Sequence, residues 1–433
     1  MEQGFSPLDD ELGLLPGSLT PQAQAALVRL GAEREFAPAA ELLAALTGIQ
    51  VSEATARRTS YALGEALLAQ QTAAAPALAP PADPGPEREQ RLQLSADGAM
   101  IQLVGGNWVE VKTLVIGELK LEAKAGAAAE PHARQLSYFS RLAPADEFTR
   151  QAVVETHRRG VRAAAAVAGV MDGALWLQGL LDYHRPDAVR ILDQPHALQH
   201  LHQLAQAIWA DTEQATNWWR EHKQVLNEQQ PQVLLGAIAA LAGQAHDVES
   251  YTQQRNYLEE RSEQMRYQEF RAAGWPVGSG IVESANKLVV ERRLKGAGKR
   301  WAAEHVNPLL VLRSGLCSGR WGEMWAQGAA ARRRAVQEHR TEQRAGRGKQ
   351  AVVSSAEGAS REQEVQIDAV VVAEVQAILA QASAAEAEEV SKPERASGQA
   401  KEGWRPADNH PWRRSPIGRA CADPQLPLPG AKL

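Results

Sequence analysis

Three acidic residues stand at the ends of predicted secondary-structure elements. Asp97 lies in the segment SADG, Asp172 in VMDG, and Glu283 in GSGIVESAN. Carboxylates delivered from two strands and a facing helix can hold two Mg²⁺ ions, which activate a water or a 3′-hydroxyl for in-line attack on a phosphodiester. The three residues therefore predict metal-dependent phosphoryl transfer. Each also has a simpler interpretation, because an Asp-Gly pair commonly forms a turn and a Glu in the first helical turn interacts favourably with the helix dipole.

An aspartate and a histidine three residues apart stand between the second aspartate and the glutamate. Asp193 and His196 belong to the segment DQPH, at a predicted junction between a strand and a helix. One carboxylate and one imidazole are a weak metal-ligand set, and His196 is equally suited to brace the fold behind the site. Asp193 and Asp172 both end predicted strands, so either is suited to be the second metal ligand. We favour Asp172.

Positive charge is concentrated after the glutamate. Residues 287–349 include 15 Lys or Arg and 5 Asp or Glu, although the whole chain has a formal net charge of −5. Part of this row fits a solvated ladder of ion pairs, because Lys287 and Glu291 are four residues apart. Its density beside the acidic residues favours contacts with DNA phosphates, which release counterions when they are neutralised. The predicted phosphate contacts are Lys287, Arg292, Arg293, Lys295, Lys299 and Arg300.

Two helices near the N-terminus are a second predicted DNA contact. Residues 36–48 and 52–69 have apolar side chains at helical spacing, and Ser52 is placed to cap the second helix. The short turn between the helices is typical of a helix-turn-helix, in which Arg57 and Arg58 would face a DNA groove. A small helical bundle without groove contacts fits the same pattern. Either way, we expect residues 1–70 to form a helical module.

An α/β sheet is predicted after a linker rich in Ala and Pro. The linker, residues 71–91, has few side chains to bury and favours extended conformations. Alternating apolar and polar residues then predict a hairpin. A third strand, a helix and two buried strands are predicted to follow, the first buried strand at the end of an alanine-rich segment because a helix precedes it and an Asp-Gly turn ends it. Together they make a sheet of mixed strand order. The ranges are 91–103 and 108–119 for the hairpin, 137–142 for the third strand, 147–161 for the helix, and 163–173 and 189–192 for the buried strands.

The segment between this sheet and Glu283 is predicted to be an all-helical insertion. Residues at about 200–273 keep apolar side chains at helical spacing and are too numerous for a loop. Trp218 and Trp219 within this insertion are interpreted as core side chains. After the insertion, Ser279 is placed to cap the helix that carries Glu283.

Composition limits the class of protein. The chain of 433 residues has 44% hydrophobic and 23% charged residues, which is typical of a globular protein with two or three domains. Its two cysteines are too few for a disulfide framework or a zinc ribbon, and it has no apolar run long enough to span a membrane. An acidic N-terminus is unlike a signal peptide, so we expect a cytoplasmic protein.

Residues 326–433 are basic and then acidic, and their low-complexity composition predicts a largely disordered tail with one helix at 369–382.

The order of these motifs resembles one family. The segments SADG, VMDGALWL, ILDQPH and GSGIVESANKLVVERRLKGAGKRW follow one another as in insertion-sequence transposases of the DDE type, in the ISKra-type group related to Mutator-like elements. The resemblance covers about residues 36–325, and several motifs in the right order are more specific than any one of them. It implies a ribonuclease H-like catalytic domain over residues 92–325, interrupted by the helical insertion.

The resemblance also assigns roles to individual residues. Asp97 and Asp172 match the two catalytic aspartates, Glu283 matches the catalytic glutamate, and the DQPH segment matches a D-x-x-H signature of such families. Trp301 closes the KGAGKRW motif, where it either stacks on an unpaired base or belongs to the core. The chain departs from the family in having no cysteine-rich, zinc-binding segment near its N-terminus.

The expected function is that of a metal-dependent DNA transposase that frees a 3′-hydroxyl and joins it to target DNA. The reaction implies two Mg²⁺ or Mn²⁺ ions, double-stranded DNA as element ends and target, no membrane partner, and a homo-oligomer that pairs two ends. The expected location is the nucleoid. Two alternatives remain: a ribonuclease H-like nuclease that cuts without joining, and a catalytically silent DNA-binding protein derived from a transposase. The intact set of three acidic residues argues against the silent protein.

Overall fold

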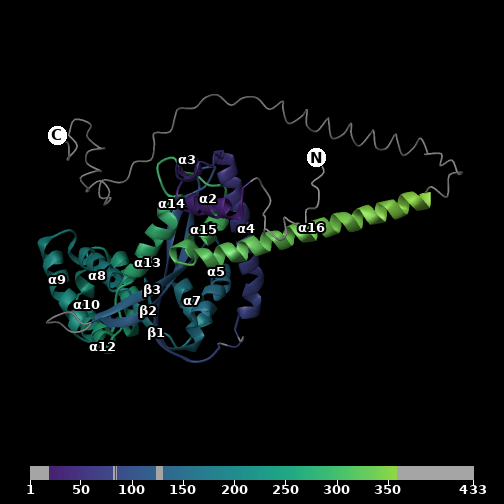
Figure 1. Ribbon diagram of the computed structural model, residues 1–433. Helices are drawn as coiled ribbons and strands as arrows, with labels where there is room; N and C mark the ends of the chain where they lie inside the picture. The colour runs from purple at the N-terminus through teal and green to yellow at the C-terminus, as the bar shows by residue number, and fades with distance from the viewer. Residues whose placement is uncertain (1–18, 81–82, 84, 123–129, 358–433) are drawn as a thin grey trace, which may run out of the picture. The chain divides into compact units, whose positions relative to one another are not determined.

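A mixed sheet of five strands in the order β3-β2-β1-β4-β5 organises the described part of the chain (Figure 1). The computed structural model describes residues 19–80, 83, 85–122 and 130–357. Strands β1, β2 and β3 pair antiparallel, whereas β4 and β5 run parallel to β1. The predicted α/β class and the mixed strand order are therefore confirmed. In chain order the strands span Arg88–Gln102, Trp108–Glu122, Glu130–Arg141, Ala164–Met171 and Val189–Leu192.

Side-chain alternation along β1 assigns residues to the two faces of the sheet. Leu92 and Leu94 contribute to the hydrophobic cluster on one face, whereas Ala99 and Ile101 contribute to a cluster on the other face. This period of two is the pattern that predicts a strand from sequence. The alanine-rich strand β4 is buried on both faces, which small side chains allow.

Helices cover both faces of the sheet. Helices α5 (Ala145–Gln151), α6 (Val153–Arg159) and α7 (Leu175–His184) lie on the face of Leu92 and Leu94. The opposite face is covered by the insertion next to β4 and β5, and by the helix of Glu283 together with α15 (Ala303–Cys317) next to β1, β2 and β3 (Figure 1). The segment predicted to be an all-helical insertion contains the helices α8 Gln194–Trp209, α9 Glu213–Glu228, α10 Pro231–Ala239, α11 Val248–Glu260 and α12 Tyr267–Ala272.

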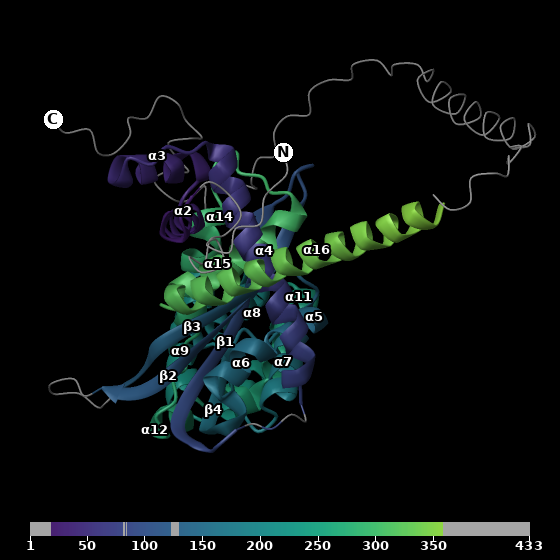
Figure 2. The same ribbon diagram turned by 45° about the vertical axis from the view of Figure 1, so that its right-hand side comes forward.

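The N-terminal helices pack directly onto α15 beside the sheet. Helices α2 (Pro21–Glu33), α3 (Phe36–Thr47) and α4 (Glu53–Leu78) share a hydrophobic cluster with Leu309 of α15. Figure 2 shows α2 and α3 beside α15, as Figure 1 does. Ser52 accepts the N–H of Thr55, which confirms its predicted role as the cap of α4.

Two segments that the sequence predicts to lack regular structure are helical. Residues 71–78 of the expected linker belong to α4, and residues 326–357 of the expected tail belong to α16 (Trp321–Glu357). Both are rich in Ala, Gln, Glu or Arg, which are good helix formers. The first turns of α16 also pack on α4, where Gly328 lies against Leu63. The predicted helix at 369–382 lies outside the described residues.

The chain divides into two compact units, Met1–Gly348 and Lys349–Leu433. The first unit contains the sheet, the insertion and helices α2 to α4, so the expected boundary near residue 70 does not separate two units. Of the second unit, only the last turns of α16 lie within the described residues. Among all the described residues, no helix is both long enough and apolar enough to cross a membrane.

The helix that carries Glu283 contains a π-helical turn. It begins as α13 (Gly280–Ala285), widens at Asn286–Glu291 and ends as α14 (Arg292–Leu294). Arg313 of α15 is buried, and its guanidinium donates to the carbonyls of Leu288 and Val289 inside the widened turn. The guanidinium therefore stabilises a backbone geometry that is uncommon outside functional sites.

We predict that Arg313→Met lowers the free energy of unfolding by about 2–4 kcal/mol, because the buried carbonyls of the π-helical turn lose their charged donor. Chemical denaturation measures this change. Lys287→Met, on the exposed side of the same turn, is the matched control and should change stability by less than about 0.5 kcal/mol. Equal effects of the two substitutions would contradict the role given to Arg313.

Candidate active site

Three aspartates lie in line across neighbouring strands. The parallel registers of β1 with β4 and of β4 with β5 place Asp97, Asp172 and Asp193 at one level of the sheet. Alternation puts all three side chains on the face that α8 and α13 cover. The row continues in polar side chains on the other two strands, where the hydroxyl oxygens of Thr113 and Ser140 are 2.9 Å apart. A polar band therefore crosses the sheet beneath the helix of Glu283.

Both oxygens of the Asp97 carboxylate accept a hydrogen bond. The N–H of Gly98 donates to Oδ1 at 2.7 Å, and Nδ2 of Asn286 donates to Oδ2 at 3.0 Å. Burial raises the pKa of Asp97, and the negative charge of Asp172 raises it further, against the opposing effect of the Gly98 hydrogen bond. The two carboxylates are therefore close enough to repel each other, which is an arrangement that a cation would relieve.

The helical insertion holds the turn that carries Asp172. Its Oδ1 accepts the N–H of Ala174 at 2.9 Å, and Gly173 adopts a positive φ of 81°, which favours glycine. The hydroxyl of Tyr257 donates to the carbonyl of Asp172, and Nε of Arg261 donates to the carbonyl of Gly173 at 3.0 Å. Two side chains from the end of α11 thus fix the backbone at the end of β4.

Asp193 joins three parts of the chain through one carboxylate. Its Oδ2 accepts the N–H of His196 at 3.2 Å and the ring Nδ1 of the same residue at 2.8 Å, and its Oδ1 accepts the N–H of Ser279 at 2.6 Å. Burial by itself would raise the pKa of Asp193, but the hydrogen bonds from His196 and Ser279 outweigh it and hold the pKa below its usual range. These donors tie Asp193 to the starts of α8 and α13, so the carboxylate has a structural role.

His196 faces the acidic row, which favours the protonated form of its ring. Its hydrogen bond to Asp193 raises its pKa most, and the charges of Asp193, Asp172 and Asp97 raise it further, while burial opposes them. The side chain of His196 is 40% exposed, whereas that of Asp193 is 2% exposed. His196 therefore braces the strand end and also offers a partly exposed imidazole to the site.

Glu283 lies close to this row without joining it. It is exposed in the first turn of α13, one helical turn before Asn286, whose side chain contacts Asp97. In the described part of the chain, no three His, Cys, Asp or Glu side chains form a group that could hold a metal ion. The structure thus brings Asp97, Asp172 and Asp193 together, and it places Glu283 on the helix that crosses them.

The predicted DNA contacts divide into exposed and occupied cations. Arg57 and Arg58 are exposed in the first turns of α4. Lys287, Arg292 and Arg300 are exposed, and among the described residues they have no hydrogen-bond or ion-pair partner. These five side chains are available to phosphates.

The other three predicted contacts are engaged within the protein. Lys295 pairs with Glu291 at 2.7 Å, and Lys299 pairs with Glu35 at 2.6 Å. Arg293 is 2% exposed, and its Nε donates to the carbonyl of Gly31. The prediction that Arg293 contacts DNA is therefore wrong, because its side chain is used to attach α2 to the core. Burial lowers its pKa to about 10.

The tryptophans in question belong to the core. Nε1 of Trp301 donates to the carbonyl of Leu294 at 2.8 Å, and its ring packs against two hydrophobic clusters. Trp218 and Trp219 pack against the cluster of the insertion, as the sequence predicts.

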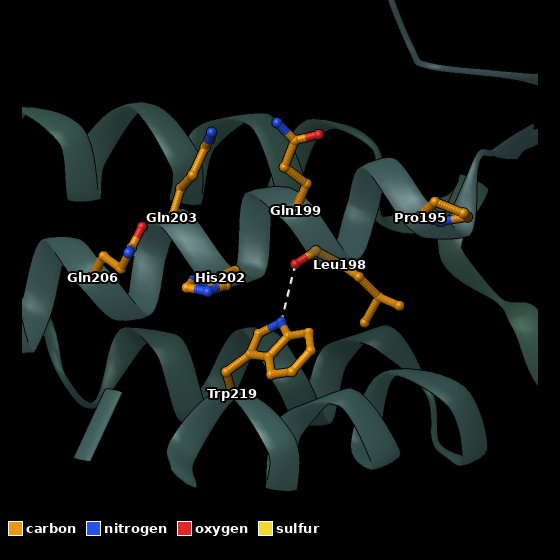
Figure 3. Close-up of a pocket in the computed structure, with 7 residues that line it drawn as sticks. All are labelled: Pro195, Leu198, Gln199, His202, Gln203, Gln206 and Trp219. Atoms are coloured by element: carbon orange, nitrogen blue, oxygen red, sulfur yellow. Dashed lines mark hydrogen bonds between the residues drawn. The ribbon is translucent and has the colours of Figure 1, made fainter. Parts of the chain in front are cut away.

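Nε1 of Trp219 donates to the carbonyl of Leu198 at 3.1 Å, across a cavity of about 510 Å³ between α8 and α9 (Figure 3). Pro195, three glutamines and His202 complete its lining, and no carboxylate does, so this cavity is not suited to metal-dependent chemistry.

No protein-family model matches this chain, and no curated protein is similar enough to count as a match. The function must therefore be argued from the residues themselves.

Several residues that shape the site escape the sequence analysis. Asn286 is three residues after Glu283, a helical spacing that puts both on one face and that could have identified it. Tyr257 and Arg261 lie in a polar stretch of the insertion and give no comparable signal. Their importance depends on where α11 packs, which only the tertiary structure decides.

We predict that the Asp193–His196 pair makes a pH-dependent contribution to stability. Because the folded-state pKa of His196 is raised, its contribution is complete below about pH 6.5 and is lost as the pH rises through the raised pKa. The lowered pKa of Asp193 makes its contribution present above about pH 4 and lost as the pH falls through the lowered value. In EDTA, His196→Gln should lower the melting temperature most at about pH 4–6.5 and least near pH 9. A difference that does not depend on pH would contradict the pairing.

We also predict that Asp172→Asn raises the melting temperature of the metal-free protein at neutral pH. The amide keeps the oxygen that accepts the N–H of Ala174 and removes the charge that repels Asp97. Because the pKa of Asp97 is raised, its ionisation costs stability as the pH rises, so the gain should be larger at pH 8 than at pH 5. Differential scanning calorimetry in EDTA tests this, with Asp146→Asn, at an exposed position of α5, as the control. A lower melting temperature for Asp172→Asn at pH 8 would refute the proposed repulsion.

Proposed function

We propose that this protein is a DNA transposase that cleaves and joins phosphodiesters with the help of divalent cations. One observation carries the proposal. Asp97 and Asp172 lie side by side at one level of the sheet, beneath a helix that also carries Glu283. A carboxylate whose ionisation is opposed by burial and by a second carboxylate beside it is typical of metal and catalytic sites.

The architecture supports a ribonuclease H-like assignment. The mixed sheet, followed by an all-helical insertion before the last acidic residue, is the arrangement that the resemblance to DDE transposases implies. Helices α3 and α4, joined by a short turn, support a helix-turn-helix module. Arg57 and Arg58 are exposed in the first turns of α4, the position at which a recognition helix meets a groove.

The residues present suit a hard cation such as Mg²⁺ or Mn²⁺. Asp97 and Asp172 would hold it, because carboxylate oxygens are its preferred ligands. Glu283, which does not join them in this structure, would have to approach to complete the ligand set. The side-chain oxygen Oδ1 of Asn286 is buried beside Asp97 without a partner among the described residues, which also favours an additional polar occupant. When bound, two such ions supply a nucleophile and stabilise the leaving oxygen in phosphoryl transfer.

The chain's own groups orient the substrate and its ligands. His196 offers a partly exposed imidazole beside the acids, and Asp193 holds its ring in place. The exposed cations Lys287, Arg292 and Arg300 lie on and after the helix of Glu283, where they would neutralise the phosphates of a DNA end. Because transposition joins two element ends to one target, the reaction would require a homo-oligomer.

The proposal is tested with a donor plasmid that carries the gene and its flanking DNA, a target plasmid and Mg²⁺ or Mn²⁺. We expect nicked donor ends and joined products that sequencing can map. Asp97→Ala should reduce both by at least about a hundredfold while DNA binding is retained. Asp146→Ala, at an exposed acidic position remote from the row, is the matched control.

The three possible outcomes separate the candidate functions. Joined products support a transposase. Cleavage that needs Asp97 but never yields joined products assigns the ribonuclease H-like nuclease instead. DNA binding without metal-dependent cleavage by the unaltered chain assigns the silent DNA-binding protein.

A further inference from the structure

Asn286 occupies an unusual position for a buried polar side chain. It is 6% exposed, and it begins the π-helical turn of the helix that carries Glu283. Its Nδ2 donates to Oδ2 of Asp97 at 3.0 Å across the space between helix and sheet. A buried amide next to a half-buried carboxylate is costly to keep unless the two form a hydrogen bond.

The hydrogen bond completes the orientation of Asp97. The N–H of Gly98 holds Oδ1 at 2.7 Å, and Asn286 holds Oδ2, so the plane of the carboxylate is fixed from both ends. The two donors come from different elements, one from the strand itself and one from the helix above it. Loss of the Gly98 hydrogen bond would remove a contact within β1. Loss of the Asn286 hydrogen bond would remove a contact between the helix and β1.

The helix is held in the register that makes this contact. At its start, the N–H of Ser279 donates to Asp193, and in its middle Arg313 donates to the carbonyls of Leu288 and Val289. The widened turn lies between these two anchors and begins at Asn286. A π-helical turn shifts the side chains that follow it relative to those before it, and such turns occur often at functional sites.

We propose that Asn286 is a positioning residue, which fixes the Asp97 carboxylate and couples it to the helix of Glu283. The pairing itself is independent of any activity, whereas its role in metal binding rests on the proposed function. The carboxylate is then presented in one orientation, with its remaining lone pairs directed into the site. A hydrogen-bonded ligand of this kind commonly changes metal affinity by 10 to 100-fold when its partner is removed.

A charge swap tests the pairing on the full-length protein in EDTA. Asn286→Asp replaces the donor by a second carboxylate of the same shape, so the melting temperature at pH 7.5 should fall. Adding Asp97→Asn restores one donor and one acceptor with the roles reversed, and the melting temperature should recover. Such recovery in a double-mutant cycle requires direct interaction, because independent effects add.

Ser284→Asp is the matched control for the charge swap. It adds the same charge at an exposed position of α13, two residues before Asn286, and Asp97→Asn should not change its effect. Recovery that is limited to the Asn286 variant supports the pairing. If Asp97→Asn restores neither variant, or restores both equally, the pairing is refuted.

Metal binding tests the positioning role. Mn²⁺ affinity is measured by calorimetry on the metal-free full-length chain, and Asn286→Leu should weaken it by about 10-fold or more. Ser284→Ala should leave it unchanged. Unaltered affinity in Asn286→Leu overturns the positioning role, even if the charge swap confirms the hydrogen bond.

The two tests also distinguish this inference from the proposed function. If the unaltered chain binds no Mn²⁺, the metal-dependent function fails. The charge swap then decides by itself whether Asn286 fixes Asp97.

Discussion

The carboxylate of Asp193 is the constraint on which the arrangement of the candidate site depends. A nearly inaccessible carboxylate is costly unless donors satisfy it, and here they come from the start of α8, from the ring of His196 and from the start of α13. Ser279 lies 86 residues after Asp193 in the chain, with the whole helical insertion between them. By satisfying these donors together, Asp193 fixes where the insertion leaves the sheet and where the helix of Glu283 returns to it.

Near Asp193, the fold places two carboxylates so close together that they repel each other. Asp97 and Asp172 are held side by side, and burial and repulsion together raise the pKa of Asp97. Packing alone gives no reason to keep two acids in such positions, since neutral side chains would be more stable there. The cost is offset by hydrogen bonds from Gly98, Ala174 and Asn286, which orient the carboxylates without neutralising them. Strain of this kind concentrates where a protein binds a cation or performs chemistry.

The surrounding helices act mainly as supports. Tyr257 and Arg261 at the end of α11 hold the turn of Asp172, and Arg313 holds the π-helical turn above Asp97. The basic residues have two different environments. Arg293 attaches α2 to the core, whereas Lys287 and Arg300 are exposed. The protein therefore uses part of its basic segment to assemble the core, and part of it stays on the surface.

Local patterns in the sequence determined most of the elements and the identity of the acidic residues. Alternation predicted the two strands of the hairpin, and Asp97, Asp172 and Asp193 were recognisable because each follows or interrupts an apolar run. The sequence could not determine which acids share a level of the sheet, since that depends on the register between strands far apart in the chain. It was also unable to separate buried from exposed cations, because Arg293 and Arg292 are adjacent and differ only in what packs against them. Composition misjudged residues 71–78 and 326–357, where good helix formers continue helices that neighbouring elements support. Tertiary structure alone decided these points, because hydrogen bonding and burial between distant segments select among conformations that local propensity leaves nearly equal in free energy.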